Sequence, residues 1–460
     1  MAILAVIGGV AAGMSAAAKA RRTNADLEIR VYTDEAHISY GACGLPYYIS
    51  GEIEKETRLM ARSVEQFATL GIKVFTRYRV EEIRPRDQII QVRNLNTGEM
   101  TEVAYDQLVI ATGASVLVPP VEGRDLTGVF KLRNVVDGVA IRRYIEETKP
   151  KAGVIVGGGY IGLEMAETMH RYGIKVTIVE MAPQIVPNMD KDMAQILENY
   201  LISQGIEVRT AEKVLSLRGG RESIDQAGFS GEEVFPPDRL QQVITERGII
   251  PADLVLLSVG VVPNSQLAEK AGIELGVRRA IRINSRMETN LPRIYAAGDC
   301  ANTTHLVTGE EVYIPMGTTA NKQGRTAGEN AAGGKAEFKG VVGTGIAKVL
   351  DLEIARTGLT ERECQDRDLP YEVRIIKAWT KAGYYPGAGQ IHVKVLAQKS
   401  GGRLLGAQIV GQAGSGKRID VFAAALTLGA TIEQLKDLDL AYAPPFAPVY
   451  DPILVAINQF

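Results

Sequence analysis

The chain has 460 residues, of which 46% are hydrophobic and 23% are charged, enough for two or three domains with separate cores. Its net charge of −2, without a basic tract, excludes an electrostatic footprint for nucleic acid. Three cysteines are too few for a disulfide framework and indicate a reducing compartment. Apolar runs are short, and the apolar first 20 residues lack the charged start of a signal peptide. We therefore expect a cytoplasmic protein that binds neither nucleic acid nor membrane.

The chain begins with a predicted nucleotide-binding unit. An apolar strand, the turn from Gly8 to Gly13, an Ala-rich helix and a strand at residues 28–32 form a βαβ pattern. Val10 replaces the middle glycine of the dinucleotide fingerprint, and Asp34 lies just beyond the position where an acid commonly ends the second strand. The turn alone fits either dinucleotide binding or close packing of helix on strand.

A second unit matches the fingerprint fully. A strand at residues 152–156 precedes the run Gly157-Gly158-Gly159-Tyr160-Ile161-Gly162, and the next strand, residues 175–179, ends in Glu180. Glu180 follows Gly157 by 23 residues, close to the roughly 20 expected for an acid that binds the adenosine ribose. Its charge would repel a 2′-phosphate, and residues 181–183 contain no arginine, which favours NADH over NADPH. The alternative is a glycine turn that serves packing only.

Small-residue turns follow three further predicted strands. Residues 105–113 end in Thr112 and Gly113, and residues 254–260, after the second unit, echo this pattern and end in Gly260. Residues 294–301 place Asp299 at a predicted helix start, where its carboxylate would accept from a polyol hydroxyl or cap the helix. Residues 218–246 are polar and predict a surface insertion around a hairpin.

The last quarter of the chain changes pattern. Residues 329–340 predict a linker, and beyond them alternating strands at 390–397 and 404–410 precede an apolar helix at 419–428. The predicted division is a discontinuous first domain, a second domain and a C-terminal α+β domain, at residues 1–113 with 254–330, 114–253, and 341–460.

Cys43 lies in a Gly-rich, Pro-ended turn, residues 39–48, shortly after the first unit. Five residues later stands Tyr48, so no local disulfide can form. Cys43 would cycle alone as thiolate, mixed disulfide, persulfide or sulfenic acid, or else serve as a buried small hydrophobe. Cys300 is expected to be buried, and Cys364 to be incidental.

Almost the whole chain resembles the flavin-dependent pyridine nucleotide-disulfide oxidoreductases, in the branch with a single active-site cysteine. That branch includes coenzyme A disulfide reductases, NADH-dependent persulfide or polysulfide reductases, and NADH oxidases; no rhodanese domain is expected here. The matching segments are Gly8 to Gly13, Ser39 to Tyr47, Ala111 to Gly113, Gly157 to Gly162 with Glu180, Ala297 to Asp299, Pro315 to Gly324, and Tyr442 to Pro445.

The resemblance implies an α/β fold with two Rossmann-like nucleotide-binding domains, for FAD and NADH, and a C-terminal α+β dimerisation domain. It implies a homodimer or higher homo-oligomer in which one subunit completes the active site of the other. The residues expected to bind FAD are Gly8, Gly13, Asp34, Thr112, Gly113 and Asp299. Those expected to bind NADH are Gly157, Gly159, Tyr160, Gly162, Glu180 and Gly260.

Two features indicate the branch of the family: a histidine that this chain lacks and two tyrosines that it carries. Oxidases of this group carry a histidine in the first glycine turn, where this chain has Ala11. Tyr384 and Tyr442 lie in segments resembling those from which coenzyme A disulfide and persulfide reductases direct tyrosines to the substrate sulfur. A phenol there can protonate a leaving thiolate, although interface packing would also account for both residues.

Coenzyme A is a further candidate ligand. Arg22 and Ser39 match positions that contact it in such reductases, and Ser15 and Lys19 are helix neighbours able to help. Ala42 and Tyr450 depart from the pattern, because asparagine and lysine are common there, which leaves glutathione and inorganic polysulfide as alternative substrates.

Our hypothesis is an FAD-dependent NADH:persulfide/polysulfide or coenzyme A disulfide reductase. Cys43 is the nucleophile, and its pKa is expected to be lowered by a helix N-terminus or a nearby cation. The alternatives are an NADH oxidase that forms peroxide or water, and a flavoprotein redox sensor or electron carrier for a protein partner.

Overall fold

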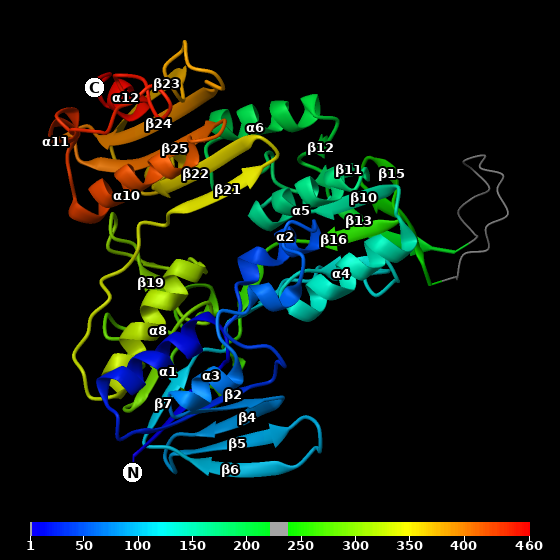
Figure 1. The fold of residues 1–460 in the computed structure, drawn as a ribbon, viewed down its shortest axis with the longest axis vertical. Coiled ribbons are helices and arrows are strands. Elements are labelled where there is room, and N and C mark those ends of the chain that lie inside the picture. Colours follow the sequence, from blue (N-terminus) through cyan, green and yellow to red (C-terminus); the bar gives the residue numbers. More distant parts are fainter. Residues whose placement is uncertain (1, 221–237) are drawn as a thin grey trace.

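The computed structural model describes residues 2–220 and 238–460, which form two parallel sheets and a C-terminal antiparallel sheet (Figure 1). The first sheet has the order β18 (Ile294–Ala296), β7 (Gln107–Ile110), β1 (Ile3–Ile7), β2 (Glu28–Thr33), β3 (Ile72–Thr76). The second has the order β12 (Glu207–Arg209), β11 (Lys175–Val179), β10 (Ala152–Val156), β16 (Leu254–Leu257), β9 (Val129–Lys131). Every neighbouring pair in both sheets is parallel, as βαβ connections require.

The two sheets repeat one arrangement. In each, the strand before the glycine turn (β1 or β10) lies between the strand that follows its helix (β2 or β11) and a later strand (β7 or β16). The predicted echo between residues 105–113 and 254–260 is therefore real. It also moves one predicted boundary: β16 pairs with β10, so residues 254–257 belong to the second sheet and not to the first domain.

Helices cover these sheets and connect them. They are α1 (Ala11–Thr23), α2 (Leu45–Ile49), α3 (Val64–Thr69), α4 (Val135–Thr148), α5 (Tyr160–Arg171), α6 (Lys191–Ser203), α7 (Gln266–Lys270) and α8 (Gly317–Ala331). Helix α8 lies directly on α1: a Cβ added to Gly324 or Gly328 would lie about 2 Å from the carbonyl oxygen of Ala12 or Ala16. Glycines thus allow the two backbones to approach.

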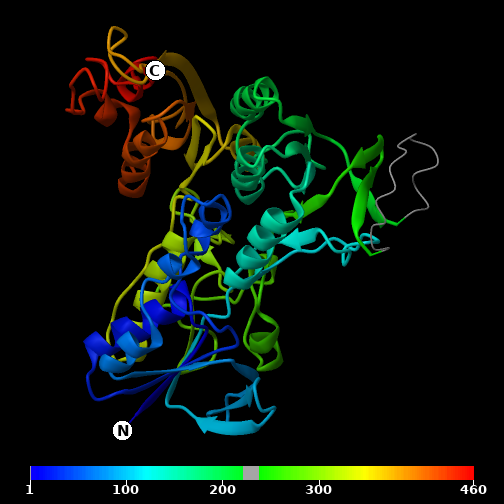
Figure 2. The same ribbon diagram turned by 45° about the vertical axis from the view of Figure 1, so that its right-hand side comes forward.

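Helix α2, which follows Cys43, packs against the second unit and not only the first (Figures 1 and 2). Thr168 Oγ1 of α5 donates to Pro46 O at 3.2 Å, and the Tyr172 hydroxyl donates to Ile49 O at 2.8 Å. Arg142 of α4 donates to Tyr48 O at 3.1 Å, and its guanidinium lies 4.9 Å from the centre of the Tyr48 ring. The segment that follows Cys43 is therefore held by the second unit as well as by the first.

The C-terminal sheet is antiparallel, with the order β21 (Gly345–Val349), β22 (Leu352–Gly358), β25 (Leu404–Gly411), β24 (Gln390–Gln398), β23 (Tyr371–Trp379). Its helices are α9 (Glu361–Gln365), α10 (Ile419–Leu428), α11 (Ile432–Lys436) and α12 (Pro452–Ile457). An apolar core that includes Phe422 and Ile457 fills the side covered by α10 and α12, and α6 of the second unit lies against β25 (Figure 1).

Smaller sheets complete the described part of the chain. They are β4 (Tyr78–Arg84) with β5 (Ile89–Asn94) and β6 (Met100–Ala104); β13 (Val214–Gly219) with β14 (Leu240–Thr245) and β15 (Gly248–Pro251); β8 (Ala114–Val116) with β17 (Val261–Pro263); and β19 (Thr303–Thr304) with β20 (Glu311–Val312). The predicted insertion at 218–246 begins and ends in the antiparallel pair β13–β14, but its residues 221–237 lie outside the described residues. No helix among the described residues is long and apolar enough to cross a membrane.

One local prediction was wrong, and another began three residues too early. Asp299 does not start a helix: it lies in a turn closed by Ala301 N and Gly298 O, and the next helix, α8, begins at Gly317. The predicted linker at 329–340 begins inside α8, which ends at Ala331. Asn330 is buried there and bonds to the backbone of Arg286 and Ala336, so this polar stretch continues the helix through side-chain contacts.

Candidate active site

The first glycine turn borders a cavity of about 710 Å³. A Cβ on Gly8, whose φ is +117°, would lie 2.1 Å from Ala111 O, and a Cβ on Gly13 would lie 1.9 Å from Gly8 O. The turn is therefore possible only with glycine at both positions. Val10 stands at the N-cap of α1 and has no polar side chain, so the first amides of α1 stay free for an anionic group at this turn.

Two acids line the cavity beyond β2. Asp34 is exposed and lies 3.4 Å from the Arg79 guanidinium. Glu35 accepts a 2.8 Å hydrogen bond from the Tyr40 hydroxyl, and burial raises the pKa of both groups. The Glu35 carboxylate is therefore already hydrogen bonded within the turn that leads to Cys43. Asp34 is exposed and is the acid at this end of the cavity that is more available to a ligand.

The turn after β7 is joined to the turn after β16. Thr112 Oγ1 donates to Asn264 O at 2.6 Å, and Asn264 Nδ2 donates back to Thr112 O at 2.9 Å. Gly113 adopts a φ of +69°, and a Cβ there would lie 3.2 Å from an Arg133 nitrogen. Thr112, Gly113, Arg133 and Asn264 all line the cavity.

Arg133 connects this cavity to Asp299. Its Nη2 lies 3.3 Å from Asp299 Oδ2, and its Nε donates to Ala114 O at 2.7 Å. Burial raises the pKa of Asp299, and the charge of Arg133 opposes that rise. An acid and a cation are thus held together at the wall of the site, neither of them part of the glycine turn.

The second glycine turn repeats the geometry of the first. A Cβ on Gly157 (φ +108°) would lie 2.5 Å from Ser258 O, and one on Gly162 would lie 2.2 Å from Gly157 O. A Cβ on Gly159 would meet no atom within 4 Å, so the open side of the turn is at its middle position. Glu180 accepts from Gly158 N at 2.8 Å and from Ala182 N at 2.7 Å, which fixes its carboxylate beside the turn.

Tyr160 and Gly260, both predicted to contact the dinucleotide, differ in their surroundings. Tyr160 is turned toward the C-terminal domain, where a Cβ on Gly345 would lie 3.0 Å from its hydroxyl. Gly260 is exposed, with a φ of +112° and open space where a side chain would stand. Gly260 therefore leaves room for a ligand, whereas Tyr160 packs across a domain boundary.

Cys43 is the exposed cysteine of the chain, in a turn of 3-10 helix (Ala42–Gly44) next to the cavity-lining Ala42. Cys300 and Cys364 are fully buried, as expected for the former. Partial desolvation raises the pKa of the Cys43 thiol, the carboxylates of Glu164 and Asp299 raise it further, and Arg133 opposes them. The expected lowering of this pKa is therefore wrong for the chain's own groups, because burial of the thiol and two nearby carboxylates outweigh the one cation.

Two acid–base groups lie close to Cys43. Burial, reinforced by the charge of Glu167, raises the pKa of Glu164 on α5 to about 7. Burial and the charges of Glu164 and Glu167 raise the pKa of Tyr47 to about 12. Glu164 is therefore able to hold or release a proton near neutral pH beside the thiol.

The two predicted tyrosines lie together in the C-terminal domain. A hydrogen bond with Tyr384 raises the pKa of Tyr442. The exposed fractions are 78% for Tyr384 and 46% for Tyr442, and neighbouring large apolar side chains, Phe446 and Tyr450, are exposed as well. This surface lies beyond β23, in a different part of the chain from α2 and Cys43 (Figure 1).

The predicted coenzyme A residues follow the face of α1 next to α8. Ser15 accepts a 2.9 Å hydrogen bond from Asn321 Nδ2, and Lys19 forms a 2.8 Å ion pair with Glu329. Arg22 is exposed at the end of the helix, and Ser39 adopts a φ of +49° one residue before Tyr40. The structure therefore brings Ser15, Lys19 and Arg22 onto one face, with a carboxylate already beside Lys19.

Residues 3–324 match the pyridine nucleotide-disulphide oxidoreductase family, and residues 345–452 match its dimerisation domain. The chain belongs to this family. It is 40% identical over 452 residues to the "NAD(P)H sulfur oxidoreductase (CoA-dependent)" of Pyrococcus furiosus, covering 98% of this chain and 97% of that protein. It is 37% identical over 456 residues to a "NADH oxidase" of Methanocaldococcus jannaschii, covering 99% and 97%. The solved structure of a NAD-dependent persulfide reductase from A. fulgidus superposes with a TM-score of 0.92 at 38% identity, covering 99% of this chain and 82% of that one.

These matches confirm the predicted family, the fold class and an oxidoreductase that depends on FAD and NAD(P)H. The matched dimerisation domain indicates a homodimer. The site residues fit both cofactors: the cavity, the free helix N-terminus and Arg133 suit FAD, and the open side of Gly159 beside Glu180 suits a dinucleotide.

The sequence analysis missed Arg133, Asn264 and Glu164. Asn264 ends the run Val261-Val262-Pro263-Asn264, and the run Asn134-Val-Val-Asp137 forms a capping box just after Arg133. Neither pattern marks a cofactor contact, because each becomes informative only when β9 pairs with β16 and the turn after β16 meets the turn after β7. Glu164 is two residues beyond Gly162, where an acid on a buried helix face was itself a signal.

Proposed function

We propose that this protein is an NADH-dependent reductase of disulfides and persulfides of low-molecular-weight thiols, with coenzyme A as the favoured thiol. The observation that carries the proposal is that one cysteine, Cys43, is exposed, while Cys300 and Cys364 are buried. The charges of Glu164, Asp299 and Arg133 act on the pKa of the Cys43 thiol. The 40% identical relative named as a CoA-dependent sulfur oxidoreductase supports the same substrate class.

Cys43 provides the nucleophile. Its thiolate attacks one sulfur of a disulfide, a Cys43–substrate S–S bond forms, the original S–S bond breaks, and one thiolate leaves. For a persulfide, attack on the inner sulfur releases hydrosulfide and leaves the same mixed disulfide. FAD and NADH, when bound, would supply two electrons in the form of a hydride, and these together with one proton return the mixed disulfide to two thiols.

Tyr442 and Tyr384 supply the proton for the leaving thiolate. Because they are hydrogen bonded to each other and exposed on the C-terminal domain, we assign this role to the tyrosines of the second subunit in the homodimer. The exposed apolar surface around them, with Phe446 and Tyr450, would be covered by that contact.

The electrostatics of the turn bear on the resting state. The raised pKa of Cys43 disfavours a free thiolate at neutral pH, whereas a mixed disulfide with coenzyme A would carry no charge on this sulfur. Arg22 and Lys19 would hold the anionic nucleotide phosphates, and Ser15 and Ser39 would donate hydrogen bonds. Lys19 would then exchange its Glu329 partner for a phosphate.

The test is anaerobic NADH oxidation with coenzyme A disulfide, coenzyme A persulfide and polysulfide in parallel, with oxygen as a separate acceptor. We expect Cys43→Ser to lower the sulfur-dependent rate at least about 100-fold while FAD stays bound. Cys364→Ala is the matched control, because this buried thiol acts only as a small apolar group. Near-normal sulfur reduction by Cys43→Ser would refute the proposal.

An NADH oxidase is the second candidate, favoured by the 37% identical relative of that name. Against it, Ala11 stands where oxidases of this family place a histidine; His37 lines the flavin cavity but comes from the segment after β2. Turnover with oxygen alone would establish the oxidase. Absence of turnover with every acceptor would favour the redox sensor or electron carrier.

A further inference from the structure

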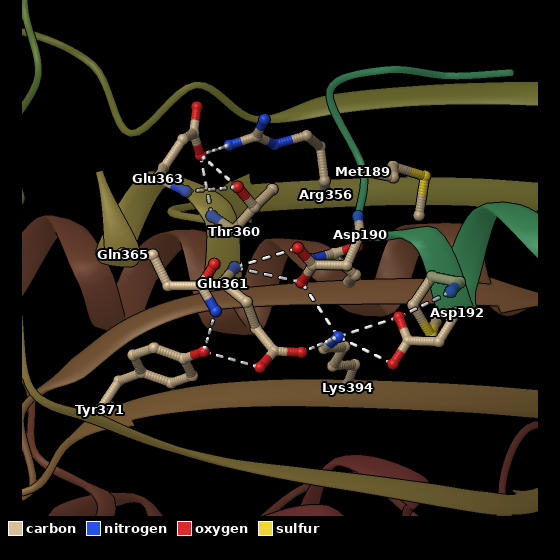
Figure 3. A network of polar contacts seen from close by, with 12 residues as sticks. Met189, Asp190, Asp192, Arg356, Thr360, Glu361, Glu363, Gln365, Tyr371 and Lys394 are labelled. Carbon is tan, nitrogen blue, oxygen red and sulfur yellow. Dashed lines mark hydrogen bonds and ion pairs between the residues drawn. The ribbon is translucent and has the colours of Figure 1, made fainter. Parts of the chain in front are cut away.

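A buried lysine joins the second unit to the C-terminal domain. Lys394 of β24 is completely buried, and its Nζ lies 2.8 Å from Asp192, 2.5 Å from Glu361 and 3.1 Å from Asp190 (Figure 3). Glu361 belongs to the C-terminal domain, whereas Asp190 and Asp192 lie at the start of α6. An ammonium group without water needs such partners, so these two domains depend on each other here.

The ammonium stays charged in this environment. Burial lowers the pKa of Lys394, but hydrogen bonds to Asp192 and Glu361 and the charge of Asp190 outweigh burial and raise it. Three carboxylates around one cation leave the group with an excess of negative charge. Removing the lysine would therefore make the carboxylates of the two domains repel each other.

Asp190 makes its side-chain contacts with the C-terminal domain. Its Oδ2 accepts from Gln408 Nε2 at 2.6 Å, its Oδ1 accepts from Glu361 N at 3.0 Å, and its backbone N donates to Gln408 Oε1 at 2.8 Å. Two residues earlier, Asn188 O accepts from Arg356 Nη1 at 2.6 Å. Residues 188–192 are thus anchored on β22, β24 and β25.

The segment between Glu180 and Asp190 lies on the second glycine turn. Val186 N donates to Gly158 O at 2.9 Å, and Ile185 packs so closely on Gly158 that a Cβ there would lie 2.8 Å from Ile185 Cγ2. Val186 adopts a φ of +47°, which a β-branched residue keeps only when its surroundings enforce it. Glu180 at one end faces the dinucleotide, and Asp190 at the other end binds the C-terminal domain.

The outer side of this segment borders a cavity of about 680 Å³, lined by Ala182, Pro183, Gln184 and Pro187 and by Glu361, Arg362 and Gln365 across from them. Because open space separates these residues, apolar packing does not close the domain boundary along this side. Along this side the polar group around Lys394 connects the two domains, whereas elsewhere Met189 and Leu197 share one apolar core with Ile354 and Val410.

We propose that Lys394 is a positioning residue for the dinucleotide: through Asp190 and Asp192 it holds residues 181–190 against the second glycine turn and sets NADH affinity. The inference rests on the proposed NADH site of the second unit and is independent of the sulfur substrate. It assigns to the C-terminal domain a role within its own subunit, in addition to dimerisation.

The experiment is a calorimetric titration of FAD-loaded protein with NAD⁺, so that the readout is binding and not turnover. We expect Lys394→Met and Asp190→Ala each to weaken NAD⁺ binding about tenfold. The control is Lys417→Met, which breaks an exposed ion pair with Asp420 in the same domain and should stay within about twofold of the unchanged protein. Hydrogen exchange should rise in residues 181–190 of both test variants and stay unchanged in the control.

Unchanged NAD⁺ affinity in folded Lys394→Met and Asp190→Ala would overturn the inference, as would an equal loss in Lys417→Met. Should Lys394→Met not fold, Asp190→Ala decides alone, because the Asp190 side chain makes no capping bond to α6. If the unchanged protein binds no NAD⁺, the proposed NADH site itself is refuted, and the inference with it.

Discussion

The two glycine turns of this chain share a frame and differ at the middle position. In both, the third glycine packs against the carbonyl of the first, at 1.9 Å for a Cβ on Gly13 and 2.2 Å on Gly162. The middle residue is Val10 in the first turn, where it packs against the apolar cluster that includes Tyr40 and Leu45. In the second it is Gly159, which faces open space. Close backbone packing requires glycine at the outer positions. At the middle position, the residue type depends on the group that faces the turn.

The strongest test of this division is alanine at an outer glycine. Gly13→Ala and Gly162→Ala should each lower the free energy of unfolding by about 3 kcal/mol or more, because their Cβ atoms overlap a carbonyl oxygen. Gly159→Ala is the matched control. Urea unfolding followed by circular dichroism measures all three, and equal stability of Gly13→Ala and Gly159→Ala would break the comparison.

A substitution at the middle position should change NADH affinity strongly and the free energy of unfolding only slightly. Gly159→Ala adds a methyl group to open space at an ordinary φ of −79°, so stability should change by less than about 0.5 kcal/mol. NADH affinity should fall on the order of 30-fold, because the methyl group would stand where the pyrophosphate approaches. Fluorescence titration with NADH measures this, and unchanged affinity would contradict the assigned open side.

In each unit an acid follows the strand after the glycine turn and its helix. These two acids should differ in their effect on NADH binding. Glu180→Gln should weaken NADH binding about tenfold and reduce the preference over NADPH, because the carboxylate beside Gly158 N loses its charge. Asp34→Asn, in the first unit, should leave the NADH dissociation constant unchanged. A loss of NADH binding in both variants would show that the two sites are not separate.

The smallest effect concerns pH. Glu164 on α5 corresponds to Ser15 on α1, two residues after the third glycine. Its folded pKa of about 7 exceeds the ordinary value of 4.5, so this carboxyl destabilises the fold progressively as pH rises from about 4.5 through 7. Glu164→Gln should therefore gain about 1 kcal/mol over the unchanged protein between pH 6.5 and pH 8.5. Thermal unfolding at both pH values measures this, and a pH-independent difference would contradict it.

The sequence predicted local features well and long-range contacts poorly. The strands at 152–156 and 175–179 and the helix at 419–428 have the predicted bounds, because each is an apolar run ended by Gly or charge. The helix expected at Asp299 was wrong and the linker at 329–340 began three residues too early, since an ion pair with Arg133 and the contacts of Asn330 decide those conformations. Arg133 reaches the site only through the pairing of strands far apart in the chain, which no local pattern encodes.

The contacts between α2 and the second unit also limit which segments of such proteins can be exchanged in a chimaera. Cys43 is encoded with the first unit, yet the segment that follows it is held by Arg142, Thr168 and Tyr172 of the second. A chimaera that exchanged residues 114–257 alone would place a foreign surface against Pro46, Tyr48 and Ile49. The reactive turn and the second unit must therefore be inherited together, although more than 60 residues separate them in the gene.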